Sequence, residues 1–195
     1  APALEPFPSI DTPIARALLL PAFAPGWQVY LDNCAGAVPG RVAQFAEEFA
    51  QRAVAALPAL TERDMLLHGD IRADNLFFDG GAMKVVDFQF AARGCGAADI
   101  AYLVTQGLRT EVREGHDEAL VREYLDRLVA GGVADYAFED AWRQYRCAAV
   151  YLMVLPVITL NGWEALPERS RQLCLTLTDR AVAAIDEIDA LEVFE

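Results

Sequence analysis

Residues 66 to 90 read LLHGDIRADNLFFDGGAMKVVDFQF and concentrate polar side chains in an otherwise apolar chain. Asp70 and Asn75 lie five residues apart, and Asp87 follows twelve residues after Asn75. A carboxylate and an amide oxygen, completed by phosphate oxygens and water, suit Mg²⁺, which proteins hold with few side chains. A second carboxylate nearby could accept a proton from an attacking hydroxyl group. These residue types indicate metal-assisted transfer of a phosphoryl group.

The apolar segments around these residues explain how they could meet. MLLHGD, NLFF and MKVVDF are too short for helices and predict strands, and DGGA at 79–82 predicts the turn of a hairpin. We expect Phe78 to pair with Met83 across this turn. That register places Asn75 beside Asp87 at the open end of the hairpin.

The loop that precedes the hairpin supplies the other candidates. Asp70 can fold back over the open end of the hairpin and act as a base. Arg72 could stabilise negative charge on a transferring phosphoryl group, or it could simply pair with Asp74. A different possibility is a metal-dependent phosphohydrolase, in which His68 would join Asp70 and Asp87 as a metal ligand.

Helical patterns surround this segment. Apolar residues recur every three or four positions from 41 to 57, which predicts an amphipathic helix. Seven of the ten prolines lie in residues 1–40, so we expect a mostly irregular lead-in with one short helix near 14–20. The expected fold class is mainly α with a small β-hairpin. Helices are predicted after the hairpin at 99–108, 118–130, 138–155 and 167–188.

Composition limits the class of protein and its partners. The chain has 195 residues, 54% of them hydrophobic, which is enough for one domain with one core. Its net charge of −13 repels phosphate backbones and anionic membranes, so neither nucleic acid nor a membrane is an expected partner. The four separated cysteines favour reduced thiols and a cytoplasmic location. The apolar run at 147–160 is broken by Pro156 and is too short to span a bilayer.

The segments HGDIRADN and VVDFQ resemble the catalytic segment of the aminoglycoside phosphotransferase and choline kinase superfamily, which shares the protein-kinase-like fold. DFQ and the downstream GAADIAYLV are most similar to its choline kinase-like and ecdysteroid kinase-like branch. The resemblance implies ATP as phosphoryl donor and a small-molecule hydroxyl as acceptor. It also implies that Asp70 is the catalytic base and that Asn75 and Asp87 bind Mg²⁺.

Three further roles follow from the same resemblance. Arg72 occupies the position at which protein kinases carry a lysine that touches the transferred phosphate. His68 is similar to a residue that holds the loop in place. Asp99 matches the acidic residue that hydrogen-bonds to the catalytic loop, so His68 and Asp99 are expected to give structural support.

The chain departs from the family pattern in one respect. These kinases place a glycine-rich loop and an ATP-binding lysine in an amino-terminal lobe, and Lys84, on the hairpin, does not match that lysine. We therefore expect a carboxy-terminal helical lobe at 41–195, after the lead-in 1–40, with a catalytic loop at 66–75 and a metal-binding hairpin at 75–90. Without the amino-terminal kinase lobe the chain is expected to be inactive by itself. The alternative is a non-catalytic kinase remnant that acts as a binding or scaffold module.

Overall fold

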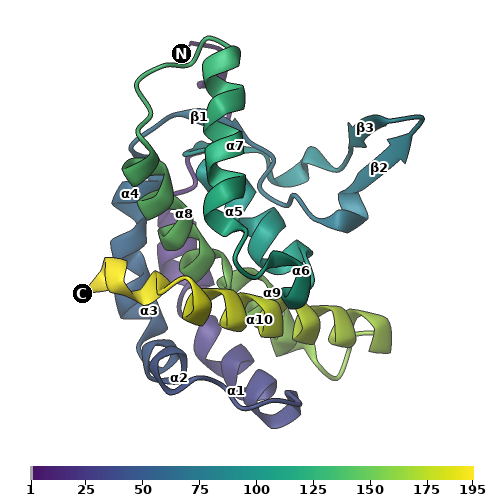
Figure 1. Cartoon of the computed structure of the whole chain (residues 1–195). Helices are drawn as coiled ribbons and strands as arrows, with labels where there is room; N and C mark the ends of the chain where they lie inside the picture. The colour runs from purple at the N-terminus through teal and green to yellow at the C-terminus, as the bar shows by residue number, and fades with distance from the viewer. Residues whose placement is uncertain (1) are drawn as a thin grey trace.

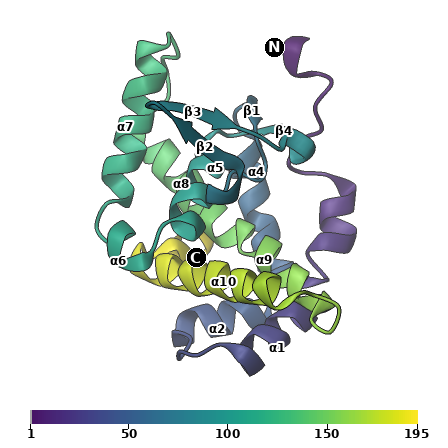
Figure 2. The same cartoon turned by 90° about the vertical axis from the view of Figure 1, so that its right-hand side faces the viewer.

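A computed structural model describes residues 2–195 as a mainly helical molecule with two small antiparallel sheets (Figures 1 and 2). The expected fold class is confirmed in this respect. The strands are β1 (Met65–Leu67), β2 (Leu76–Asp79), β3 (Ala82–Val85) and β4 (Ala92–Gly94). The helices are α1 (Phe23–Asn33), α2 (Gly40–Glu47), α3 (Phe49–Arg52), α4 (Leu57–Thr61), α5 (Ala97–Tyr102), α6 (Thr110–Arg113), α7 (Asp117–Ala130), α8 (Phe138–Leu152), α9 (Val154–Thr159) and α10 (Glu168–Glu187).

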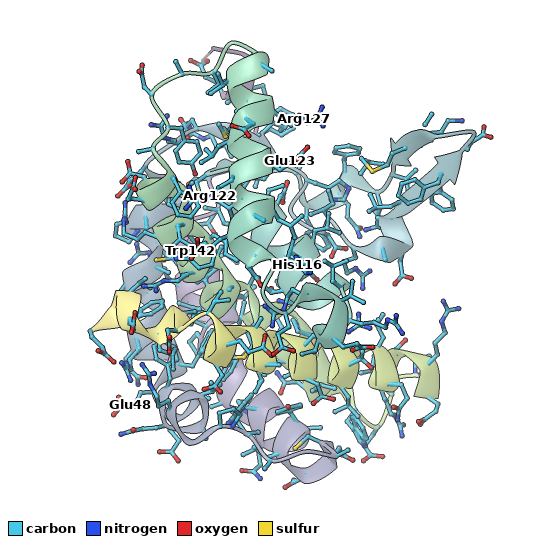
Figure 3. The ribbon with its side chains drawn as sticks, in the orientation of Figure 1. Glu48, His116, Arg122, Glu123, Arg127 and Trp142 are labelled. Atoms are coloured by element: carbon cyan, nitrogen blue, oxygen red, sulfur yellow. The ribbon has the colours of Figure 1, made fainter. Side chains whose placement is uncertain are left out.

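Helix α8 forms the centre of the core. It packs against α4, α5, α7 and α10, and its Ala141, Tyr145 and Ala148 are fully buried. Small alanine side chains allow these helices to approach closely, and burial of their apolar faces is the main stabilising contribution. By contrast α7 lies on the surface, where exposed ion pairs such as Glu123 with Arg127 line its outer face (Figure 3).

The long apolar stretch extends further than the sequence indicates. The helical turns continue from Phe138 to Gly162, with an interruption at Met153, and by length and composition they could cross a membrane. However, 67% of the apolar window is buried inside the protein, as expected for a core helix. The interruption precedes Pro156 by three residues, because a proline cannot donate a hydrogen bond to the carbonyl of Leu152.

The short helix expected near 14–20 is present as a π-helix at Ala15–Leu19, but the expectation that the rest of residues 1–40 is irregular is wrong, because α1 is an eleven-residue helix inside this segment. Its Phe23 is fully buried and stacks on Phe49 with ring centroids 3.7 Å apart. Pro25 lies in the first turn of α1, where the missing N–H has no intrahelical partner to lose. This part of the chain therefore contributes directly to the hydrophobic core.

The predicted helix over 41–57 is divided at Glu48, whose backbone angles of φ −111° and ψ 19° leave the helical region. Helices α2 and α3 lie on either side of this break. Val42, Phe45 and Phe49 are nevertheless all buried, so the apolar stripe was placed correctly on the inner face.

The hairpin has the predicted register. Phe78 pairs with Met83, and the two-residue turn consists of Gly80 and Gly81, with φ of 54° and 88°. Positive φ at both turn residues is the geometry that matches the twist of the two strands, and glycine adopts it without steric cost. The hairpin projects from the helical body (Figure 1).

A second sheet closes the base of this segment. Strand β4, which was not predicted, pairs antiparallel with β1, and Leu67 lies opposite Ala92. The backbone of Arg93 also exchanges hydrogen bonds with Pro8 and Ile10, which ties the amino-terminal segment to the same place. The segment between β1 and β4, which contains the loop and the hairpin, therefore starts and ends at the same small sheet.

Candidate active site

Asp70 lies on the loop between β1 and the hairpin and is 9% exposed. Its Oδ1 lies 3.3 Å from the Tyr102 hydroxyl, which donates to it, and 3.1 Å from Arg72 Nε. The Asn75 amide nitrogen donates to the Asp70 carbonyl at 2.8 Å and lies 3.5 Å from Oδ2. Burial raises the pKa of Asp70 above its ordinary value, although Arg72 and the hydrogen bonds oppose this effect. A carboxylate of this kind accepts a proton more readily than an exposed one.

Arg72 contacts Asp70 rather than Asp74. The Nε of Arg72 is 3.1 Å from the carboxylate, but its N–H does not point along a hydrogen bond, so the contact is an ion pair without a directed hydrogen bond. The side chain is 28% exposed. Its positive charge therefore lies beside the candidate base and within reach of solvent.

Asp99 holds the backbone of the loop. Its two carboxylate oxygens accept hydrogen bonds from the backbone N–H groups of His68, at 2.6 Å, and Gly69, at 3.1 Å. Burial raises the pKa of Asp99, and the two backbone donors lower it in part. Gly69 has φ of 79°, and a Cβ there would lie 2.2 Å from the carbonyl oxygen of Phe90. The loop is thus held from α5 on one side and pressed against the segment after the hairpin on the other.

Both ring nitrogens of His68 form hydrogen bonds. Its Nδ1 accepts from the backbone N–H of Asp70 at 3.2 Å, which leaves Nε2 to donate to the Val86 carbonyl at 2.8 Å. The ring is 5% exposed and packs against Phe88. No ring nitrogen is left to bind a metal, so the phosphohydrolase interpretation loses the ligand that it requires. His68 instead connects the loop to the end of the hairpin.

The register of the hairpin brings Asn75 next to Asp87. The Asn75 carbonyl accepts from the backbone N–H of Val86 at 3.0 Å, and Asp87 is the following residue. Asn75 is 6% exposed and its amide nitrogen is committed to Asp70. Within residues 2–195 its Oδ1 accepts no hydrogen bond, so this oxygen is available to a ligand.

Asp87 differs from the loop residues because it is exposed and has φ of 67°. Left-handed backbone is uncommon outside glycine, tolerated best by Asn and Asp, and often found at functional sites. Gln89 donates to its carboxylate at 3.3 Å, and no arginine or lysine in the described part of the chain forms an ion pair with it. A carboxylate without an ion-pair partner and an amide oxygen that accepts no hydrogen bond fit a hard divalent cation such as Mg²⁺.

This donor set is small by the standards of dedicated metal centres. Among residues 2–195, no group of three or more His, Cys, Asp and Glu side chains is arranged to hold a metal ion. Mg²⁺ is usually bound by one or two carboxylates together with substrate phosphates, so two side-chain ligands are the number that such a site needs. Lys84 lies 3.8 Å from Asp79 with both side chains exposed, and it takes no part in this arrangement.

Tyr102 is a site residue that motif reasoning missed. It is 4% exposed, and burial together with the charge of Asp70 raises the pKa of its hydroxyl well above the ordinary range. The sequence does contain a signal, because Tyr102 follows Asp99 by three residues on a predicted helix. Residues three apart share a helix face. A face that presents Asp99 to the loop backbone therefore presents Tyr102 to the loop as well.

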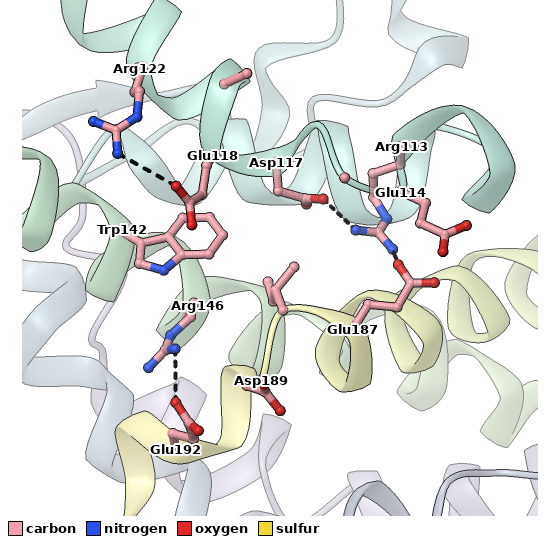
Figure 4. Close-up of a pocket in the computed structure, with 13 residues that line it drawn as sticks. Arg113, Glu114, Asp117, Glu118, Arg122, Trp142, Arg146, Glu187, Asp189 and Glu192 are labelled. Atoms are coloured by element: carbon pink, nitrogen blue, oxygen red, sulfur yellow. Dashed lines mark hydrogen bonds and ion pairs between the residues drawn. The ribbon is translucent and has the colours of Figure 1, made fainter.

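A separate hollow of about 720 Å³ lies between α7, α8 and α10 (Figure 4). Its three arginines all form ion pairs: Arg113 with Asp117 and Glu187, Arg122 with Glu118, and Arg146 with Glu192. None of the predicted site residues lines it. We interpret its ion pairs as structural links between the surface helix and the carboxy-terminal helix.

Fold and site together define a mainly helical protein with a buried carboxylate on a braced loop beside an exposed carboxylate at a hairpin end. A model of the phosphotransferase enzyme family matches residues 5–146, which is most of the chain. The chain belongs to this family, and the match confirms the predicted relationship to phosphotransferases. No curated protein sequence matches the chain. The family match includes the loop and the hairpin, and it begins within the segment expected to be a lead-in.

Proposed function

We propose that this chain forms the carboxy-terminal, helical lobe of a small-molecule kinase of the choline kinase-like type, which transfers the γ-phosphoryl group of ATP to a hydroxyl. Family membership supports phosphotransfer as the class of reaction. One observation carries the finer proposal. Asp70 is buried with a raised pKa and is linked through Asn75 to the hairpin end, where Asp87 is exposed.

In this proposal Asp70 is the general base. The acceptor hydroxyl transfers its proton to an Asp70 oxygen and attacks the γ-phosphorus atom of ATP, while the bond from this phosphorus to the bridging oxygen breaks and ADP leaves. Tyr102 and Arg72 contact Oδ1, and Asn75 lies near Oδ2, so the carboxylate keeps one orientation. A positioned general base of this kind typically contributes about 10²- to 10⁴-fold in rate.

The hairpin end would hold the metal. Asn75 through Oδ1 and Asp87 through its carboxylate are the residues that fit Mg²⁺, which neutralises charge on the phosphate oxygens when it is bound. Arg72 is placed to add positive charge on the side of the base. His68 and Asp99 keep the loop in position and do not touch the reacting atoms.

The nucleotide cleft needs surfaces beyond residues 1–195 in this proposal. The resemblance to protein-kinase-like enzymes implies a strand-rich lobe that covers the nucleotide, and the strands described here form two two-stranded sheets around the loop and hairpin. We therefore expect the isolated chain to bind ATP weakly, as measured by calorimetry. Nanomolar affinity of the chain alone would contradict the assignment to one lobe.

The role of Asp70 is tested by Asp70→Ala in the intact protein, measured as transfer or hydrolysis of the ATP γ-phosphate. We expect turnover to fall by at least about 10²-fold while circular dichroism shows an unchanged fold. Asp79→Ala, at the exposed tip of the same hairpin, is the control and should retain activity. Undiminished turnover of Asp70→Ala would exclude Asp70 as the general base. No turnover by the unmodified protein would favour the alternative of a non-catalytic kinase remnant.

The metal ligands are tested without an activity assay. Mn²⁺ in place of Mg²⁺, added with inorganic pyrophosphate, should broaden the NMR signals of the Asn75 side-chain amide. The Asp87→Asn variant should show this broadening only at higher Mn²⁺ concentration. Equal broadening in Asp87→Asn and the unmodified chain would exclude Asp87 as a ligand.

A further inference from the structure

A second cavity lies beside the loop that carries Asp70, and Gly69 of this loop, but not Asp70, lines it. It measures about 200 Å³, and we call it the inner cavity. Its walls come from the amino-terminal segment 9–19, from β1 and β4, and from α5, α8 and α9. Most of its lining is apolar, including Leu67, Leu152 and Leu155.

Tyr151 stands out among the residues that line the inner cavity. It is 3% exposed, and none of the side-chain hydrogen bonds found within residues 2–195 uses its hydroxyl. The hydroxyl of a tyrosine whose ring is buried usually finds a hydrogen-bond partner, so this one is free to meet a ligand in the cavity. Burial and the nearby charge of Asp11 raise the pKa of Tyr151 to about 12. The hydroxyl therefore stays protonated and can donate a hydrogen bond.

The other polar groups at the wall already form hydrogen bonds within the protein. Asp99 accepts from the loop backbone, and the Tyr102 hydroxyl donates to Asp70. Thr12 accepts from the backbone N–H of Ala15 through its hydroxyl oxygen. Ser9 and Thr12 keep their hydroxyl protons but are only half-buried, so Tyr151 is the most buried donor that an occupant would meet among mainly apolar walls. Such a wall disfavours an ionised ligand.

The size of the cavity limits the occupant further. An apolar cavity of about 150 Å³ is known to hold a benzene molecule. About 200 Å³ therefore has room for one ring with a small substituent and excludes a long acyl chain or a nucleotide.

We propose that the inner cavity binds a small neutral molecule with one ring and one hydrogen-bond acceptor, and that the hydroxyl of Tyr151 donates a hydrogen bond to this acceptor. Gly69 and Asp99 form part of the same wall. An occupant therefore packs against the loop that carries Asp70 and stabilises it. This binding site is separate from the proposed phosphotransfer site and does not depend on that function.

Two probes of equal shape test the chemistry of the site. Acetophenone carries a carbonyl oxygen, and α-methylstyrene replaces that oxygen by a CH₂ group. In NMR titrations of the full chain, we expect acetophenone to bind about 3- to 10-fold more tightly, as one hydrogen bond allows. Tyr151→Phe should abolish this preference and leave the affinity for α-methylstyrene unchanged. Equal affinities in the unmodified chain, or a preference that survives Tyr151→Phe, would overturn the proposal.

A variant that fills the inner cavity tests whether the probes bind there. Ala15 lines the cavity from a half-buried position, so Ala15→Leu should weaken both probes by at least about 10-fold. Ala17→Leu adds the same atoms at an exposed position of the same helical turn and should change neither affinity. Binding that persists in Ala15→Leu would place the probes elsewhere.

The coupling to the loop is read from hydrogen exchange. Acetophenone should slow exchange of the backbone N–H groups of His68 and Gly69, which donate hydrogen bonds to the Asp99 carboxylate. Unchanged exchange at saturating acetophenone would refute the stabilisation of the loop.

Discussion

The proposed catalytic loop and the end of the hairpin are neighbours in space but are built in opposite ways. Around Asp70 the polar groups are buried and committed to partners on α5, on the loop itself and at the hairpin end. Asp87 is exposed, has a left-handed backbone and makes one long contact with Gln89. A base benefits from a fixed position in a low-dielectric setting, whereas a metal ligand must remain open to phosphate and water. The difference in burial between Asp70 and Asp87 thus follows their proposed roles, whereas Asn75, the second proposed ligand, is buried and links the two regions.

The largest expected effect tests the rigidity of the loop. Gly69→Ala combines a left-handed backbone with a Cβ only 2.2 Å from the Phe90 carbonyl oxygen, so we expect a loss of more than about 3 kcal/mol in the free energy of unfolding. Gly115 has a similar φ of 75° and open space around it. Gly115→Ala should therefore lose about 1–2 kcal/mol, as measured by denaturant titration. Equal losses would show that the loop does not press against the segment after the hairpin.

The same chemical change in both regions compares them directly. Asp99→Asn replaces an acceptor of two buried N–H groups by an amide that can accept only one of them well, at a cost of about 1–3 kcal/mol. Asp87→Asn alters an exposed group and should change stability by less than about 0.5 kcal/mol. Denaturant titration measures both variants. Similar values for the two would contradict the contrast between a braced loop and an open hairpin end.

A smaller effect concerns pH. The folded-state pKa of Asp70 is raised above 3.8, so the folded protein binds this proton more readily than the unfolded chain, and the carboxylate destabilises the fold above its raised pKa. Asp70→Asn should be more stable than the unmodified chain at neutral pH. The difference should shrink as pH falls through the raised pKa and vanish below 3.8. Thermal unfolding at a series of pH values checks this prediction. A stability difference between the two proteins that does not change with pH would show that the charge of Asp70 is not its cause.

The smallest expected effect separates Tyr102 from the base itself. The hydrogen bond of its hydroxyl lowers the pKa of Asp70, so Tyr102→Phe should raise that pKa and shift the acid limb of the activity profile to higher pH. The maximal rate should change by only a few-fold, since Asp70 is retained. Tyr124→Phe, which removes a hydroxyl that lies near Met65 on β1, is the control. An unshifted acid limb would leave Tyr102 as a packing residue.

The parts of the site that local rules govern could be predicted from the sequence. The DGGA turn and the two-residue period of the strands define the register, and the adjacency of Asn75 and Asp87 follows from it. The contact between Arg72 and Asp70 does not follow from any local rule, because Asp74 was an equally near partner in sequence. Side-chain choice of this kind depends on burial, which only the folded chain defines.

The elements that were missed owe their structure to tertiary contacts. Strand β4 has three residues without alternation and exists because β1 lies beside it. Helix α1 was hidden by Pro21 and Pro25, which read as helix breakers although the second lies harmlessly in the first turn. The inner cavity has no local signal, since its walls come from five separate parts of the chain.

The central claim is that the loop supplies the base and the hairpin end supplies the metal ligand. The most direct test is the rate of phosphate transfer from ATP as a function of Mg²⁺ concentration for the intact protein, Asp70→Asn and Asp87→Asn. We predict that Asp70→Asn lowers the maximal rate by at least about 10²-fold with an unchanged Mg²⁺ requirement. Asp87→Asn should raise the Mg²⁺ concentration needed for half-maximal rate. An unchanged Mg²⁺ requirement in Asp87→Asn, or a full maximal rate in Asp70→Asn, would contradict the division of roles.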